Sequence, residues 1–408
     1  MESTQRDVFQ GIMYYYRENT VICRYAVAWK EEVDRELLQQ AFEKVRPLAR
    51  YFFQKVVWEK RECHLEPNDA PFTVRLGHAQ PNVLENNNDF LLACSCEGNH
   101  IYFDWFHFLA DGRGGSQLMT LVLKQYCNLR YGTHFACEAL VEEQPYDIEE
   151  ILAQYPESYV ANDMQKDVTQ TVEQEPRCIR LRLDKQSLLD AALPLGVKPF
   201  SALMTIFCKA GREYFGRDEL MYNYSTDARK ALGTPKALFN CVASFQRPIT
   251  VTAEDTLETL TPGVDADIKA NLTPERQRFR LAEQMGWVYQ VYRQRASLKI
   301  KKRVFQMGEY ISGFPSDFWV SYQGDPFVPA DPDLEKYLTD FQTWVPADGA
   351  SIGVECTTLH GVITICIQNK AQKPGYAAAL RHAFESAGVK VLEAAELGPS
   401  PYTSPYIP

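Results

Sequence analysis

The sequence predicts a protein of the α/β (α+β) class with two lobes, each a mixed β-sheet with helices. Three observations support this prediction. The chain has 408 residues, a length that suggests two or three folded units. Its 45% hydrophobic and 24% charged fractions are typical of globular proteins. Strand-like runs alternate with helix-like runs in both halves, on either side of an acidic stretch without apolar periodicity.

In the first half, residues 20–30 are rich in β-branched and aromatic side chains and predict a strand. Residues 31–45 and 115–129 repeat their apolar side chains at the helical period and predict two helices. The turn-forming run Glu97-Gly98-Asn99 predicts a hairpin between the last two strands. Further strands are expected at 51–60, 72–77, 90–96 and 100–107.

In the second half, helices are expected at 200–215, near 276–295 and near 375–387. Strands are expected at 178–183, 220–224, 239–251, 318–322, 352–358 and 362–368. We therefore divide the chain into an N-terminal lobe at 1–142, an acidic linker at 143–176, a C-terminal lobe at 177–396 and a Pro- and Tyr-containing tail at 397–408.

Charge and composition exclude several classes of protein. With 53 acidic and 43 basic residues, the formal net charge is −10, which argues against nucleic-acid binding. The eleven cysteines are odd in number and contain no Cys-x-x-Cys pair, as expected for reduced thiols. The sequence contains no uninterrupted run of about 18 apolar residues, so no integral membrane segment is expected. The N-terminal residues do not resemble a signal peptide. We expect a cytoplasmic protein.

The chemically informative stretch is 100–116, HIYFDWFHFLADGRGGS. In a strand that ends at His107, the histidine shares an aromatic face with Phe103 and Trp105. A histidine in that position can act as a general base near neutral pH. Asp111 follows in a loop whose glycines allow backbone angles that other residues avoid, and we expect it to brace this loop. On position alone, a hydrogen-bonded core histidine and a helix-capping Asp111 explain the same residues.

The segment from His107 to Gly112 resembles the HxxxDG motif of the chloramphenicol-acetyltransferase-like superfamily. This family includes condensation domains, plant BAHD acyltransferases and bacterial alcohol acetyltransferases. Four other segments resemble family segments in the same order: 46–50 (RPLAR), 226–229 (TDAR), Phe239-Asn240 and 320–324 (VSYQG). The resemblance spans about residues 20–368. It implies two lobes with an active-site tunnel between them and a strand at 320–324 that crosses between the halves.

In this family an acyl group passes from a thioester, on coenzyme A or on the phosphopantetheine of a carrier protein, to a hydroxyl or amine. The resemblance implies that His107 deprotonates the acceptor, which attacks the thioester directly, while Asp111 and Gly112 shape the loop. Arg50 is the preferred partner of Asp111, and Arg229 is the second choice. Candidates for contact with the oxyanion or the substrate are Ser321, Tyr322, Trp105 and Asn240. The thioester is a co-substrate, and no permanently bound cofactor is expected.

One basic cluster stands out: Arg295, Lys299, Lys301, Lys302 and Arg303. It is either a solvated helix end, or a site for the phosphates of coenzyme A or for an acidic acyl carrier protein. We favour an acyl-CoA-dependent acyltransferase. Two alternatives stay open: a condensation enzyme that takes its acyl group from a carrier protein, and a catalytically silent binding protein on the same fold.

Departures from the family pattern narrow the assignment. Phe106 replaces a first histidine found in many members, and Tyr322 replaces the usual asparagine. The Asp-Phe-Gly-Trp-Gly motif is missing, which disfavours the plant BAHD subgroup.

Cys94 and Cys96 are interpreted as buried thiols rather than as zinc ligands together with His100, because no fourth ligand accompanies the three residues. No metal is therefore expected. Five other histidines have no evident acidic partner and are interpreted as structural: His64, His78, His134, His360 and His382.

Overall fold

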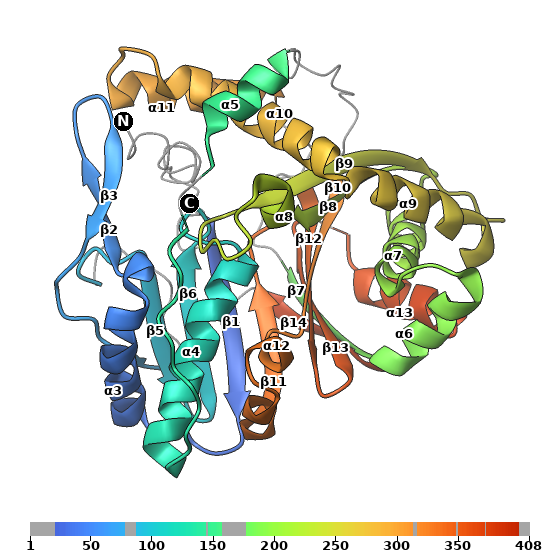
Figure 1. Ribbon diagram of the computed structural model, residues 1–408. Helices are drawn as coiled ribbons and strands as arrows, with labels where there is room; N and C mark the ends of the chain where they lie inside the picture. Colours follow the sequence, from blue (N-terminus) through green and yellow to red (C-terminus); the bar gives the residue numbers. More distant parts are fainter. Residues whose placement is uncertain are drawn as a thin grey trace.

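The computed structural model describes residues 21–77, 87–143, 146–156, 177–312, 316–347, 350–371 and 373–399. Two sheets lie side by side, one in each lobe, so the predicted fold class is confirmed (Figure 1). The five-stranded sheet has the order β11 (Leu338–Trp344), β1 (Ile22–Trp29), β6 (His100–Phe106), β5 (Leu92–Glu97) and β4 (Arg75–Leu76). The seven-stranded sheet has the order β14 (Val391–Pro399), β7 (Arg177–Asp184), β13 (Val362–Asn369), β12 (Ala350–Leu359), β10 (Ser316–Gly324), β8 (Glu219–Asp227) and β9 (Val242–Thr250).

Two helices cover one face of the five-stranded sheet: α3 (Arg35–Val45) and α4 (Gly112–Tyr131). The carboxylate of Asp34 caps α3 by accepting backbone N–H groups of the first turn. Leu38 and Phe42, one turn apart, are buried on the face that packs on the core. The β5–β6 hairpin also forms as predicted, with a two-residue turn in which Gly98 has φ 55°.

Four helices cover the outer face of the seven-stranded sheet: α6 (Lys185–Ala192), α7 (Pro199–Phe215), α9 (Leu257–Asn271) and α13 (Tyr376–Ser386). Alternation along β10 explains how this sheet serves both a core and a cavity. Phe318 is fully buried and meets Phe207 of α7. Trp319 and Ser321 point the other way and line a cavity between the lobes.

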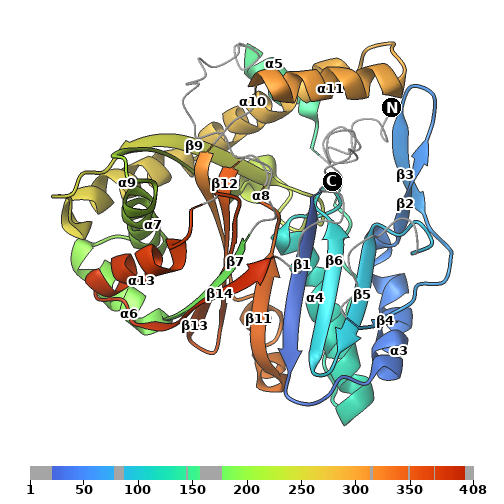
Figure 2. The ribbon, with the colours of Figure 1, turned by 180° about the vertical axis from the view of Figure 1, so that it is seen from behind.

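Two further helices, α10 (Pro274–Tyr292) and α11 (Leu298–Ser312), reach from the C-terminal lobe across to the N-terminal lobe (Figures 1 and 2). There they meet the separate ribbon formed by β2 (Gln54–Trp58) and β3 (Cys63–Pro67). The Leu298 N–H donates to the carbonyl of Lys60 (3.1 Å), and the Tyr292 hydroxyl donates to the carbonyl of Cys63 (3.0 Å). The two lobes are therefore joined at a distance from the cavity as well as beside it.

The strand that passes between the lobes is β11. In the chain it lies between β10 and β12, two strands of the seven-stranded sheet, but it pairs with β1 in the other lobe, where Ala26 lies opposite Gln342. The resemblance assigned this crossing to 320–324, and that assignment is wrong, because β10 pairs with β8 and β12 inside the seven-stranded sheet.

Several elements were not expected from the sequence. Helix α9 contains Pro262 and Gly263, two poor helix formers, and it is stabilised by a capping box at Thr256 and Thr259 and by burial of one face. The start of the expected linker folds into α5 (Ile148–Gln154), which packs on α10. Strand β14 extends into the first residues of the expected tail. Residues 157–176, residues 400–408 and His78 lie outside the described residues.

All eleven cysteines are free thiols, and ten of them are buried. Within the described ranges, no group of three His, Cys, Asp or Glu side chains is arranged for a metal ion. No single described helix is long and apolar enough to cross a membrane, and one bent pair, α6–α7, meets that test on length and composition alone. Two histidines interpreted as lacking an acidic partner do have one: His64 contacts Glu66 (2.9 Å) and His382 contacts Glu213 (2.8 Å).

Candidate active site

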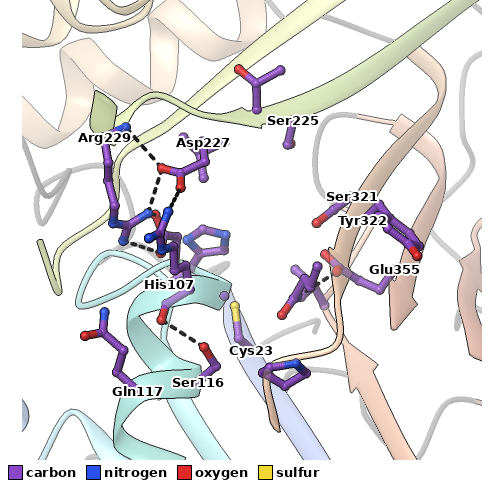
Figure 3. A pocket seen from close by; sticks show the side chains of 18 of the residues that line it. Cys23, His107, Ser116, Gln117, Ser225, Asp227, Arg229, Ser321, Tyr322 and Glu355 are labelled. Atoms are coloured by element: carbon purple, nitrogen blue, oxygen red, sulfur yellow. Dashed lines mark hydrogen bonds and ion pairs between the residues drawn. The ribbon is translucent and has the colours of Figure 1, made fainter. Parts of the chain in front are cut away.

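A cavity of about 750 Å³ lies between the lobes. Trp105 and His107 line it from the N-terminal lobe, and Ser225, Ser321 and Glu355 line it from the C-terminal lobe. Figure 3 shows His107 on one side and Ser321 and Glu355 on the other. The cavity therefore brings together side chains from four strands that are far apart in the sequence.

His107 directly follows the last residue of β6, and its N–H donates to the carbonyl of Val21 at 3.0 Å. Its half-buried ring places Nδ1 3.0 Å from the side-chain nitrogen of Asn240. The Val242 N–H donates to Oδ1 of Asn240 (2.9 Å), which turns the amide nitrogen toward the ring. In this arrangement Nδ1 accepts a hydrogen bond, so the proton of a neutral ring resides on Nε2.

Asp111 is held by a buried ion pair with Arg229, which begins the short helix α8 (Arg229–Leu232). Both carboxylate oxygens accept from the guanidinium, at 2.9 and 2.7 Å. The same oxygens accept the N–H groups of Gly114 and Cys241, each at 2.9 Å. Asp111 therefore caps α4 and also fastens the loop to the other half of the chain.

Of the two arginines considered for Asp111, the second choice is the partner. Arg50 is exposed on the turn Arg50–Phe52, and no ion pair among the described residues includes it. Burial lowers the pKa of the Arg229 guanidinium, but the Asp111 carboxylate beside it raises that pKa above its usual value. The guanidinium also donates to the carbonyls of Ala237 (2.9 Å) and Phe239 (3.1 Å).

The glycines after Asp111 are required by close approach rather than by unusual backbone angles. None of the three has a positive φ, because all lie in the first turn of α4. A Cβ on Gly114 would lie 2.1 Å from the Leu238 carbonyl oxygen, and one on Gly115 would lie 2.7 Å from the Trp105 ring. A Cβ on Gly112 would meet the side chain of Gln323 at 2.6 Å. The expectation about backbone freedom is therefore wrong, and the need for small residues is steric.

Opposite His107, Glu355 lies in the middle of the apolar strand β12 and is only 5% exposed. Its register partner on β10 is Ser321. Burial raises the pKa of this carboxyl to about 8, although hydrogen bonds from Gln323 and Ser321 lower it. The Gln323 amide donates to a Glu355 oxygen at 2.9 Å.

Gln323 links Glu355 to a chain of hydrogen bonds that extends toward the other lobe. Its side-chain oxygen accepts from the hydroxyl of Tyr25 on β1. That hydroxyl also lies 2.5 Å from the carbonyl oxygen of Gly112, at the start of α4. Glu355 is thus connected, through two neutral side chains, to the backbone of the loop that carries Asp111.

The remaining predicted site residues fall into three groups. Trp105 lines the cavity and donates its indole N–H to Ala110 (2.8 Å). Ser321 and Tyr322 also line it, and the Tyr322 hydroxyl contacts Thr358 (3.0 Å). Asn240 is not a cavity-lining residue; it contacts His107 instead, so its expected role at the oxyanion or substrate does not fit its position.

The basic cluster at Arg295 and residues 299–303 does not line the cavity. It lies at α11 and the turn before it. Lys301 is buried, donates to the Arg61 carbonyl (2.8 Å), and burial lowers its pKa. Lys299, Lys302 and Arg303 are exposed or half-exposed on α11, as is Arg295 before it. The cations that do line the cavity include Arg113 and Lys236, which sequence reasoning had not selected.

Glu355 was also missed, although the sequence carries a signal for it. A single glutamate interrupts the otherwise apolar and small-residue run Ser351-Ile-Gly-Val-Glu-Cys. A charged residue in a strand that is buried along its whole length is a sign of function. Asp227 pairs with both Arg113 and Arg229. Sequence spacing did not predict these ion pairs, because Arg113 is far away in the chain and Arg229 is only two residues away.

Comparison with known proteins places the chain by its fold. Neither a family model nor a curated protein sequence matches it. Among solved structures, polyketide synthase associated protein 5 from Mycobacterium tuberculosis is 16% identical, with a TM-score of 0.61 over 95% of this chain and 97% of that one. A trichothecene 15-O-acetyltransferase from Fusarium sporotrichioides is 12% identical, with a TM-score of 0.64 over 95% and 94%.

The first condensation domain of the CDA synthetase is also 12% identical, with a TM-score of 0.63 over 96% of this chain and 98% of that one. The similarity in each case extends over nearly the whole of both chains.

Proposed function

From the chloramphenicol-acetyltransferase-like fold of this chain, we propose that it is an acyltransferase that moves an acyl group from a thioester, preferably acyl-CoA, to a hydroxyl or amine. The observation that carries this proposal is the position of His107. The histidine of the HxxxDG motif lines the cavity between the lobes, and its loop is anchored by the Asp111–Arg229 pair. A base held rigidly in a shielded cavity suits direct proton removal from an acceptor.

In the proposed reaction, His107 takes the proton from the acceptor hydroxyl or amine as that group attacks the thioester carbonyl. The tetrahedral intermediate then expels the thiolate, which receives the proton from His107. Ser321 faces His107 across the cavity and is our choice for stabilising the oxyanion, a role in which its hydroxyl turns from the Glu355 carboxyl to the substrate (Figure 3). One preorganised donor of this kind contributes about 2.7 to 4 kcal/mol to transition-state stabilisation.

Proton uptake through Nε2 requires the other tautomer, with the ring proton on Nδ1. Asn240 must then present its oxygen or turn away, because its amide nitrogen cannot accept a hydrogen bond. We therefore propose that the Asn240 side chain reorients during the reaction, so that its oxygen accepts from Nδ1–H and Nε2 is free to take the proton. An Asn240→Asp variant, whose carboxylate accepts from Nδ1–H, is expected to stay active, while Asn240→Lys is expected to be inactive.

The central experiment measures thiol release from a panel of acyl-CoA donors, with and without alcohol and amine acceptors. We expect acceptor-dependent release that His107→Ala lowers by about 10²- to 10⁴-fold, the usual contribution of a general base. His134→Ala is the matched control, since this exposed histidine lies outside the cavity and should leave the rate unchanged. Equal rates for wild type and His107→Ala would contradict the proposal.

The donor is tested in the same assay. We favour acyl-CoA because Arg113 and Lys236 line the cavity and can attract its phosphates. Turnover of a thioester only when it is attached to a carrier protein would favour the condensation-enzyme alternative. Binding of thioesters without any transfer would favour a silent binding protein.

A further inference from the structure

Glu355 is a buried carboxyl in the cavity for which the proposed reaction has no use. It lines the cavity, yet the residue is only 5% exposed. None of the ion pairs formed within the described parts of the chain includes it. The two groups that hydrogen-bond to it, Gln323 and Ser321, are both neutral. A carboxyl removed from water without a cationic partner is energetically unfavourable in its charged form.

Among the residues that the structure describes, the neighbours of Glu355 do not provide a cation. From β1, Cys23 and Tyr25 face it, and burial raises the pKa of both groups, so both are uncharged near neutral pH. Cys356, next along β12, is raised in pKa by burial and by Glu355 itself. On β13 the register partner is Cys366, whose pKa burial also raises.

The cations that line the cavity do not neutralise Glu355. Arg229 pairs with Asp111 and Asp227, and Arg113 pairs with Asp227. Lys236 is exposed and does not contribute to the pKa of Glu355. The cavity therefore presents one buried acid whose charge nothing in the described protein neutralises.

We propose that Glu355 binds a positively charged nitrogen of the acceptor, which would be an alcohol or amine carrying a second, protonated or quaternary nitrogen. This inference rests on the proposed function, because it names the acceptor class for the same cavity. An entering cation would supply the missing partner for the carboxylate and would be excluded from water with it, which makes their attraction stronger than at a surface. Its attacking group would face His107 across the cavity (Figure 3).

The choice of an acid supports binding of a cation over a purely structural role. A glutamine at 355 could accept the same hydrogen bonds from Gln323 and Ser321 without the penalty of a buried ionisable group. The hydrogen-bond chain through Gln323 and Tyr25 therefore does not by itself explain a glutamate.

The test measures binding without any acyl donor, so it does not depend on transfer. The probes are choline and 3,3-dimethylbutan-1-ol, two alcohols of the same shape that differ in one positive charge. Ligand-observed NMR titration of the wild-type protein gives the affinity for each. We expect choline to bind about tenfold or more tightly than its neutral isostere at high pH.

The pH dependence follows from the carboxyl. Because the pKa of Glu355 is raised to about 8, the carboxylate forms as the pH rises through that value, while the charge of choline is fixed. Choline affinity should therefore rise about tenfold between about pH 7 and about pH 9, and the affinity for 3,3-dimethylbutan-1-ol should stay constant. Glu355→Gln should remove both the preference and its pH dependence.

Asp325→Asn is the matched control, since Asp325 is another acid that lines the cavity and its loss should leave the choline preference intact. Equal affinity of the wild type for both probes, no detectable choline binding, or a preference that survives in Glu355→Gln would overturn the inference. The wild-type comparison stands even if Glu355→Gln fails to fold. A choline preference without acyl transfer would remove the proposed function alone, and transfer without the preference would remove this inference alone.

Discussion

Replacing Arg229 with alanine is expected to lower the free energy of unfolding by about 3 to 5 kcal/mol, the usual loss when one partner of a buried ion pair is removed. The Arg229 side chain is 1% exposed and that of Asp111 is 3% exposed. The variant leaves the Asp111 carboxylate buried with only the N–H groups of Gly114 and Cys241 as donors. It also leaves the Ala237 and Phe239 carbonyls without the guanidinium.

The matched control is Arg113→Ala, because Arg113 also forms an ion pair beside the cavity. Its partner is Asp227, but its side chain is 58% exposed, so solvent screens the interaction. Exposed pairs of this kind contribute about 0 to 1 kcal/mol. Both variants replace an arginine with alanine, and the two ion pairs differ mainly in how deeply the arginine is buried.

Urea unfolding followed by far-ultraviolet circular dichroism measures the difference. With a denaturant slope of about 3 kcal/mol/M, a loss of about 3 to 5 kcal/mol moves the midpoint down by about 1 to 1.7 M. Arg113→Ala should move it by about 0.3 M or less. If both variants shift the midpoint equally, then Arg229 does not stabilise the fold through its buried pair and the reasoning is wrong.

Three further predictions concern the same cavity. Because the folded-state pKa of Glu355 is raised, the contribution of this carboxyl to stability is complete below its ordinary pKa of 4.5 and is lost as the pH rises toward about 8. Relative to Glu355→Gln, the free energy of unfolding of the wild type should therefore fall by about 3.5 kcal/mol between about pH 5 and about pH 8. Unfolding measured at each pH tests this, and parallel pH curves for the two proteins would contradict it. Gly114→Ala should destabilise the protein by about 1 to 3 kcal/mol, because the added Cβ would clash with a backbone oxygen. Gly263→Ala in α9 has open space around it and should be neutral or stabilise the protein by up to about 1 kcal/mol. If the melting temperatures of the two variants shift equally, the steric argument is wrong. Tyr25→Phe should lower stability by about 1 to 3 kcal/mol in the same measurement, since it removes the one hydroxyl proton that the Gly112 carbonyl and the Gln323 amide oxygen share, and an unchanged midpoint would be the contrary result.

Local signals in the sequence predicted the elements that carry His107. The turn at Gly98 specifies the β5–β6 hairpin, and apolar spacing specifies α4, because both depend on residues that are near one another in the chain. The alternation of β6 also placed Trp105 on the cavity side correctly. Such features need no knowledge of tertiary structure.

The partners of these elements could not be predicted in the same way. Arg50 and Arg229 are equally plausible partners for Asp111 as residue types, and only the fold brings one of them, 118 residues away, to the carboxylate. Glu355 likewise becomes a site residue only because β12 lies opposite β1 across the cavity. Long-range pairing, rather than composition, decides the identity of the second half of the site.

The position of β11 also bears on the order in which this protein folds. Until residues near Gln342 have been synthesised, β1 is an open edge strand, since its pairing partner lies about 300 residues further along the chain. Domains fold in turn as they leave the ribosome when their contacts are local, but this sheet is completed by one of the last strands to be made. We therefore expect the N-terminal lobe to remain dependent on chaperones during synthesis, and a fragment cut at the linker to aggregate through the exposed edge of β1.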